Sequence, residues 1–115
     1  MATVELTAAD FEKTVTEKPI VLVDFWASWC GPCRAFAPVF DRSAEAHPDI
    51  VHAKVNTEVE QELAGALDIR SIPTIMAFRD GVLLFSQPGA LPAAALEDLI
   101  TQITALDIKG IGVMI

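Results

Sequence analysis

The only two cysteines of the chain, Cys30 and Cys33, are separated by Gly31 and Pro32. If one helical turn separates them, their Cα atoms lie within the usual disulfide range, and the pair can open and close with little backbone movement. A bridge that closes so short a loop would stabilise the fold by only about 2 kcal/mol on the chain-entropy estimate. The spacing therefore predicts a reversible dithiol switch and not a structural cross-link.

The cysteines follow directly on a buried apolar segment, residues 20–27, and Pro32 is a residue type favoured in the first turn of a helix. Unpaired backbone N–H groups and the positive end of the helix dipole stabilise a thiolate at that position. We therefore expect Cys30 just before or at the first helical turn, where its thiolate is stabilised. Cys33, three residues later on the helix, is expected to be shielded.

Asp24 interrupts the same apolar segment, IVLVDFWA, whose pattern predicts a strand with neither face exposed. Burying an ionised carboxylate costs several kcal/mol, so burial raises its pKa unless the group is paired. A carboxyl group tuned in this way accepts a proton near neutral pH. Asp24 is therefore a candidate proton acceptor, and a structural carboxylate satisfied by a partner is the alternative.

The two cysteines also fit the spacing of a zinc site together with His47 and His52. Pro48 ends any helix directly after His47, however, and His52 falls in a predicted strand, so the four ligands would not converge. We therefore expect no bound metal, and we expect both histidines at the surface or at an edge.

The elements that position these residues follow from the apolar pattern. Segments 20–27 and 50–56 are apolar at most positions, which is typical of strands covered on both faces and implies a parallel or mixed sheet between helices. Asp80-Gly81 between segments 74–80 and 82–86 predicts an antiparallel hairpin.

A short strand is predicted at 3–6. Helices are predicted at 8–15, from the cysteines to Pro48 with a kink at Pro38, within 58–69, and from Pro92 to 106. The order is βαβαβ followed by ββα, an α/β fold.

The length of 115 residues suits one domain, which we place at 1–106, with a C-terminal tail of unknown role at 107–115. The net charge of −8 disfavours nucleic acid and anionic membrane surfaces as partners. The N-terminus does not resemble a secretory signal, and no apolar run approaches the ~20 residues of a membrane span. We therefore expect a soluble cytoplasmic protein.

The motif Trp29-Cys30-Gly31-Pro32-Cys33, preceded by VDFWA at 23–27, resembles the thioredoxin family, as do Ile72-Pro73-Thr74 and Gly89-Ala90. The resemblance covers about residues 3–106. It implies the thioredoxin fold, a central mixed five-stranded sheet flanked by four helices. It also implies that Cys30 attacks a substrate disulfide and that Cys33 resolves the mixed disulfide, which leaves a redox-active Cys30–Cys33 disulfide. A lowered pKa of the attacking cysteine is a known property of this family.

The resemblance implies no bound cofactor, since a flavoprotein, thioredoxin reductase, uses NADPH to restore the dithiol. Disulfide-bearing proteins are the implied substrates, and a monomer is expected. The resemblance also supports the hypothesis that Asp24 deprotonates Cys33 during resolution, directly or through water. Lys54 on the neighbouring strand is expected to adjust the charge of Asp24.

The resemblance further implies a cis bond before Pro73, which would hold the Ile72 backbone beside Cys30. With Trp29, Gly89 and Ala90 it would form a shallow apolar groove for extended chains. Position 88 departs from the family, because proline stands where a small aliphatic residue is more common.

Other residues near the motif have plain structural interpretations. We expect Trp26 in the core and Arg34 exposed on the helix, where its charge could favour the thiolate. The acidic residues Glu58, Glu60 and Glu62 are expected to form a solvated helix face. Two other functions stay open: a binding module without redox activity, and an oxidant or isomerase with a different redox potential.

Overall fold

In the computed structural model, which describes residues 2–106, five strands form one mixed sheet in the order β1-β3-β2-β4-β5. The strands are β1 (Thr3–Glu5), β2 (Ile20–Trp26), β3 (Val51–Asn56), β4 (Thr74–Arg79) and β5 (Val82–Pro88). The helices are α1 (Ala8–Glu17), α2 (Gly31–Ala46), α3 (Gln61–Ala66) and α4 (Ala93–Ala105). The order of elements confirms the predicted α/β fold.

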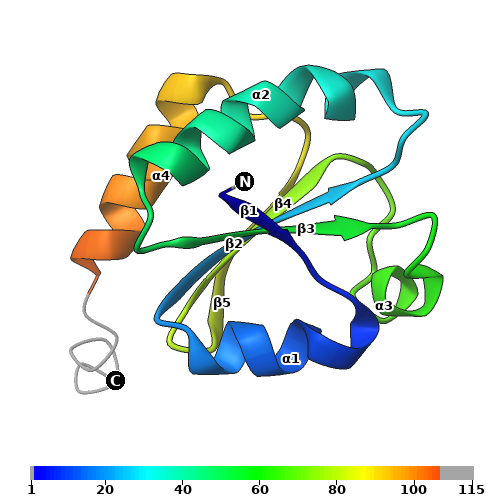
Figure 1. Ribbon diagram of the computed structural model, residues 1–115, viewed down its shortest axis with the longest axis horizontal. Helices are drawn as coiled ribbons and strands as arrows, with labels where there is room; N and C mark the ends of the chain where they lie inside the picture. Colours follow the sequence, from blue (N-terminus) through cyan, green and yellow to red (C-terminus); the bar gives the residue numbers. More distant parts are fainter. Residues whose placement is uncertain (1, 107–115) are drawn as a thin grey trace.

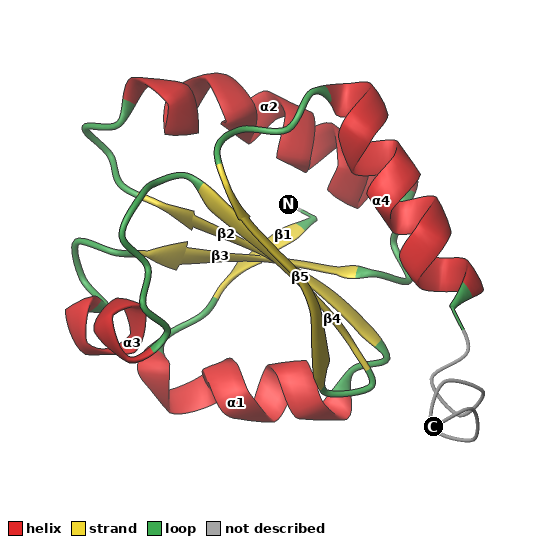
Figure 2. Cartoon of the chain, turned by 180° about the vertical axis from the view of Figure 1, so that it is seen from behind, coloured by secondary structure: helices red, strands yellow, loops and turns green. Residues whose placement is uncertain are grey.

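The pairing of the strands places β2 at the centre of the sheet. β1, β3 and β2 run parallel, whereas β4 is antiparallel to β2 and β5 is antiparallel to β4. Helices α1 and α3 lie on one face, and α2 and α4 lie on the other (Figures 1 and 2). β2 is thus covered on both sides, which is why its sequence is apolar at nearly every position.

Two apolar clusters hold these layers together, one on each face of the sheet. Alternate residues of β2 point to opposite faces, so Val21, Val23 and Phe25 pack toward α1, while Leu22 packs toward α2. The second cluster joins Phe36 and Phe40 of α2 to the buried residues of α4, which are Leu96, Ile100 and Ile103. Asp24 follows Leu22 at a spacing of two and therefore lies on the α2 face.

The boundaries differ from the predicted ones mainly around the third helix. The sequence predicts a helix within 58–69, but α3 covers only Gln61–Ala66. The shortening has a local cause, because the amide of Glu58 donates to the Asn56 side chain and that of Glu60 donates to the Asn56 carbonyl, which makes a turn. Pro92 is the N-cap of α4 and not its first helical residue.

Two further sequence expectations concern α2 and the membrane. α2 continues through Pro38, and the kink expected there stays a prediction. No helix within residues 2–106 is long and apolar enough to cross a membrane. The predicted tail at 107–115 lies outside the described residues.

Candidate active site

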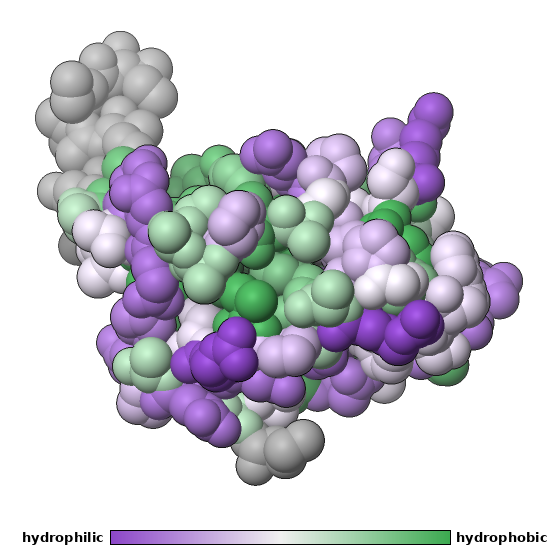
Figure 3. Space-filling model, turned by 90° about the horizontal axis from the view of Figure 1, so that it is seen from above, coloured by the Kyte–Doolittle hydropathy of each residue, from purple (hydrophilic) through white to green (hydrophobic). Residues whose placement is uncertain are grey.

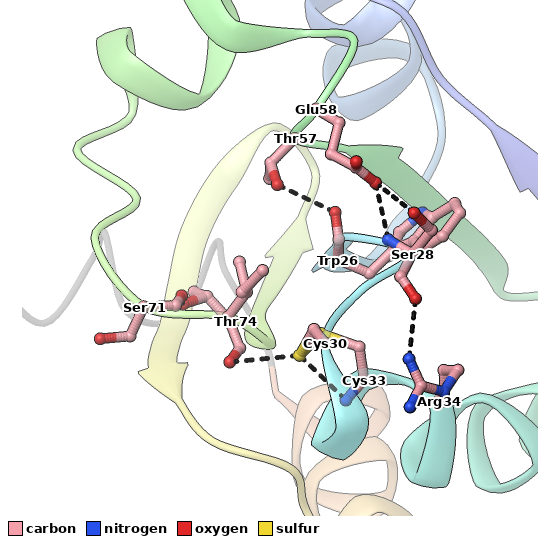
Figure 4. Close-up of a disulfide and its surroundings, with 10 residues drawn as sticks. Trp26, Ser28, Cys30, Cys33, Arg34, Thr57, Glu58, Ser71 and Thr74 are labelled. Carbon is pink, nitrogen blue, oxygen red and sulfur yellow. Dashed lines mark hydrogen bonds between the residues drawn. A yellow bond between two sulfur atoms is a disulfide. The ribbon is translucent and has the colours of Figure 1, made fainter.

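The two cysteines meet at the N-terminus of α2, where β2 has just ended. Cys30 and Cys33 form a disulfide with their Cα atoms 5.2 Å apart. Cys30 is the N-cap residue, and its Sγ accepts a hydrogen bond of 3.2 Å from the Cys33 amide (Figure 4). Gly31 and Pro32 begin the helix. The predicted position at the first turn is therefore confirmed, and a helix amide already points at the sulfur that would carry the negative charge.

Both cysteines are buried in this disulfide form, although the sequence predicts shielding for Cys33 alone. Cys30 is 4% exposed and Cys33 is 3% exposed. The cover comes from Ala27 and from the partly buried side chains of Trp26 and Ile72, which pack on the pair. Ile72 therefore borders the disulfide.

The loop before β4 forms that border. The Ile72–Pro73 peptide bond is cis, as the resemblance implies, and the Ile72 carbonyl oxygen lies 3.7 Å from Cys30 Sγ. The Gly89 amide donates a hydrogen bond of 2.7 Å to the Pro73 carbonyl, with Gly89 at φ 103°, which is a conformation that favours glycine. Ala90 follows Gly89 and is exposed. Gly89 thus joins the end of β5 to the Ile72–Pro73 loop, and Ile72 lies beside the disulfide.

Trp29 directly precedes Cys30 in the chain and is exposed. Its side chain is 68% exposed, an unusual exposure for so large an apolar group. Trp26, in contrast, is only partly exposed, and its indole N–H is buried with no hydrogen-bond partner within the described chain. Trp26 is thus less buried than the core position expected for it, since it packs on the cysteine pair, while the groove role of Trp29 stays a prediction.

Pro88 stands at the far end of β5, opposite Thr74 of β4. β5 is an edge strand, where a residue without an N–H group is tolerated. Pro88 and Thr74 line a hollow of about 160 Å³ together with Ser86 and the loop residues 67–71. The departure from the family pattern thus shapes a wall next to the Ile72–Pro73 loop.

Asp24 is fully buried beneath α2, and neither of its carboxyl oxygens has a hydrogen-bond partner within residues 2–106. Burial raises its pKa from 3.8 to about 7, while the Lys54 ammonium opposes the rise and the carboxylates of Glu5 and Asp41 add to it. The structural alternative needs a partner that satisfies the carboxylate. The described residues supply none, so the observed environment favours a proton acceptor.

Lys54 is the direct neighbour of Asp24 on the adjacent parallel strand. Its Nζ atom lies 5.1 Å from the centre of the Trp26 ring, which gives a cation–π contact. Asp24 and Lys54 therefore share one face of the sheet, and Lys54 lies on the neighbouring strand as expected.

Sequence reasoning missed the residues that hold the turn before Cys30. The backbone amide and the hydroxyl of Ser28 each donate a 2.7 Å hydrogen bond to the Glu58 carboxylate, and Arg34 donates a 2.9 Å bond to the Ser28 carbonyl (Figure 4). Thr57 donates through its amide and hydroxyl to the Trp26 carbonyl at 2.9 and 3.0 Å. Neither Ser28 nor Glu58 stands in a pattern that would reveal this contact from sequence.

The acidic cluster is therefore not simply a solvated helix face, and that interpretation is wrong for two of its members. Glu58 lies in the turn before α3, where its hydrogen bonds to Ser28 lower its pKa. Glu60 precedes α3 and accepts a 2.9 Å hydrogen bond from the Ala8 amide at the start of α1. Both carboxylates hold backbone amides that would otherwise lack a partner.

The expected position of His52 is also wrong. His52 is 1% exposed and hydrogen-bonds the Ser43 hydroxyl at 2.9 Å and the Ile50 carbonyl at 3.0 Å, since its strand is covered by α2. His47 lies at the end of α2 and pairs with Glu97 at 2.9 Å. Within the described part of the chain, no three His, Cys, Asp or Glu residues are grouped as a metal site would require.

A separate cavity of about 220 Å³ lies on the face that α2 and α4 cover, where Figure 3 shows apolar side chains gathered around a hollow. It is lined mainly by Val39, Ser43, Ala46, Ala93 and Leu96. None of the site residues predicted from the sequence lines it.

A Cys-x-x-Cys disulfide at the N-terminus of a helix that follows the central strand is typical of thiol-disulfide oxidoreductases. The comparisons with known proteins are more specific. A model of the family described as Thioredoxin matches residues 2–102. The chain belongs to the thioredoxin family, and it is a protein-disulfide reductase with a redox-active disulfide.

Individual relatives cover nearly the whole chain. A Streptomyces coelicolor protein described provisionally as thioredoxin 2 is 57% identical over 92% of this chain and 79% of its own. Thioredoxin 1 of Synechococcus elongatus is 47% identical over 81% of this chain and 89% of its own. Among solved structures, a mutant thioredoxin from Halobacterium salinarum is similar with a TM-score of 0.84 at 32% identity, over 92% of this chain and 95% of that one.

Proposed function

We propose that the reductase acts through a mixed disulfide in which Cys30 attacks and Cys33 resolves. The Cys30 thiolate attacks one sulfur of a substrate disulfide, so the substrate S–S bond breaks and its other sulfur leaves as a thiolate. Cys33 then loses its proton and attacks Cys30 Sγ, which releases the second substrate thiolate. The substrate gains two electrons, and the chain ends with the Cys30–Cys33 disulfide.

Asp24 takes the proton from Cys33 in the second half of this reaction. Three observations support the role: Asp24 lies on the α2 face, its oxygens have no partner within residues 2–106, and burial raises its pKa to about 7. A base with a pKa near the working pH is both deprotonated and strong enough to take the proton. Lys54 limits how far the pKa rises.

The groove bordered by Trp29, Ile72, Pro73, Gly89 and Ala90 receives an extended segment of the substrate. The Ile72 carbonyl lies 3.7 Å from Cys30 Sγ and is available to pair with a substrate amide. Backbone hydrogen bonds do not depend on the side chains of the substrate, so the groove suits many disulfide-bearing proteins.

Domain 1–106 carries this activity as a monomer in the cytoplasm, and thioredoxin reductase returns the disulfide to the dithiol with electrons from NADPH. The relatives named thioredoxin support the choice of thioredoxin reductase, since the reduction of one substrate disulfide oxidises the chain and a reductant must restore it.

The single observation that carries the proposal is the Cys30–Cys33 disulfide at the N-terminus of α2. The test is insulin disulfide reduction with thioredoxin reductase and NADPH, for the wild type and for Cys30→Ser and Cys33→Ser. We expect turnover by the wild type alone, and a stable mixed disulfide on Cys33→Ser. A Cys30→Ser variant that still reduces insulin would contradict the assignment of the attacking thiol, and full binding of partners without any reduction by the wild type would favour a binding module.

A further inference from the structure

A row of three charged residues crosses the sheet from its edge to its centre. Glu5 of β1 lies opposite Lys54 of β3, and Lys54 lies opposite Asp24 of β2. Directly opposite residues in neighbouring strands point to the same face, so all three side chains lie on the α2 face. Asp24 is buried, Lys54 is half-buried and Glu5 is exposed.

The charged groups that act on Asp24 come from three elements: Lys54 of β3, Glu5 of β1 and Asp41 of α2. On the β4 side Asp24 faces Ile75, which is apolar and buried. His52 is the preceding residue on this face of β3, but its ring is held by Ser43 and Ile50. Lys54 is therefore the positive charge of this environment.

Lys54 lies between the two carboxylates. Its ammonium group lies over the Trp26 ring and forms no direct ion pair within residues 2–106, so it acts on both carboxylates through space. It lowers the pKa of Asp24. It also lowers the pKa of Glu5, although partial burial has the larger effect and leaves that pKa raised. When Glu5 is ionised, its negative charge offsets part of the Lys54 charge that Asp24 experiences.

We propose that Glu5 is a positioning residue of disulfide reduction: by sharing the Lys54 ammonium with Asp24, it keeps Asp24 basic enough to take the proton from Cys33. The proposal rests on the proposed role of Asp24. Without Glu5, the full charge of Lys54 would favour ionised Asp24 and make it a weaker base.

The first test measures Asp24 directly, by a carbon-13 NMR titration of its carboxyl group in the full chain in its disulfide form. One strand, β3, lies between Glu5 and Asp24, so two strand spacings place their backbones about 10 Å apart. At effective dielectric constants of about 40 to 80, one charge at that distance shifts a titration by about 0.3 to 0.6 pH unit. We expect Glu5→Gln to lower the midpoint of Asp24 by that amount.

The second test follows the reaction. The pH at which reduction of a mixed disulfide by Cys33 reaches half its maximum rate should fall by the same amount in Glu5→Gln. Glu5→Asp keeps the charge and should restore the midpoint toward the wild-type value. Higher salt should shrink the difference between Glu5→Gln and wild type, because Glu5 is exposed and its field is screened.

Glu12→Gln is the matched control, since it removes the same charge from an exposed residue of α1, on the opposite face of the sheet. It should leave the midpoint of Asp24 unchanged. An unchanged midpoint in Glu5→Gln, or an equal shift in Glu12→Gln, would overturn the proposal and leave the role of Asp24 standing. If Asp24→Asn does not alter the pH profile of reduction, Asp24 is not the proton acceptor. The proposed role of Glu5 in the reaction then fails as well, because it acts through Asp24. The NMR titration separates the two cases.

Discussion

At the scale of single residues, the most unusual group is the buried carboxyl of Asp24. In the folded disulfide form its pKa is about 7, against an ordinary value of 3.8. The folded state thus holds a proton between about pH 4 and pH 7 that the unfolded state releases. The free energy of unfolding must fall as the pH rises through that range, because the unfolded state binds fewer protons there.

Asp24→Asn removes this titration and should stabilise the protein at alkaline pH. The shift corresponds to a gain in unfolding free energy of up to about 4 kcal/mol at pH 8, which declines as the pH falls and vanishes near pH 4. Urea unfolding of both proteins across this range measures it. A gain that does not depend on pH would show that the carboxyl is neutral throughout or is satisfied by a partner.

His52 is the second buried titratable residue, and its pKa is lowered because burial disfavours the charged ring. Here the unfolded state binds the proton more readily, so the contribution of neutral His52 is full above about pH 6.5 and is lost as the pH falls below it.

His52→Gln should therefore cost about 1–3 kcal/mol of unfolding free energy at pH 7, where two hydrogen bonds and close packing are lost. The cost should be smaller at pH 5. The measurement is urea unfolding at both pH values, with His47→Gln as the control at a partly exposed histidine. An equal cost at both pH values would mean that His52 does not titrate in this range.

At the scale of the elements, hydrogen bonds from the loop after β3 and from α2 hold the turn between β2 and α2. The Glu58 carboxylate binds the Ser28 amide and hydroxyl, and the Arg34 guanidinium binds the Ser28 carbonyl. These bonds fix the backbone two residues before Cys30. The loop after β3 thereby positions the start of the helix that carries the disulfide.

Glu58→Gln should loosen this turn because the uncharged amide accepts more weakly from the Ser28 amide. We expect faster hydrogen exchange at the Ser28 amide, by about tenfold if the change weakens the bond by about 1.4 kcal/mol of local opening free energy. Glu62→Gln is the control, since Glu62 is an exposed carboxylate of the same region. Equal exchange in the three proteins would show that Glu58 does not hold the turn.

The elements themselves were largely predictable, and particular residues show why. The run around Asp24 is apolar because β2 is covered on both faces, and Asp80 and Gly81 adopt φ values of 51° and 83° that the predicted hairpin turn requires. Cysteine spacing and Pro32 sufficed to place the disulfide on a helix N-terminus. These signals are local, so they are visible in the sequence.

Contacts between distant segments were not predictable in this way. Ser28 and Glu58 are 30 residues apart, and neither a serine nor a glutamate at these positions predicts a contact with the other. His52 was expected at the surface or at an edge although its segment is predicted as a buried strand, yet the packing of α2 buries it beside Phe40. The Ile72–Pro73 bond was expected as cis only through the family resemblance, because X–Pro bonds are mostly trans.

At the scale of the whole molecule, the described residues 2–106 already contain the sheet, both layers of helices and the complete candidate site. Within residues 2–106, the last buried member of the two apolar clusters is Ile103 of α4. The matched family model likewise ends at residue 102. We therefore predict that reduction and stability depend on residues 2–106 and not on the tail at 107–115.

Removal of residues 107–115 should leave insulin reduction with thioredoxin reductase and NADPH within about twofold of the full chain, because every proposed site residue is retained. The unfolding free energy should also change little, within the ~0.5 kcal/mol typical of changes away from the core. A longer truncation that also removes Ile103 is the positive control, because it takes a buried residue from α4. A large loss of activity from the shorter truncation alone would show that the domain which carries the reaction extends beyond residue 106.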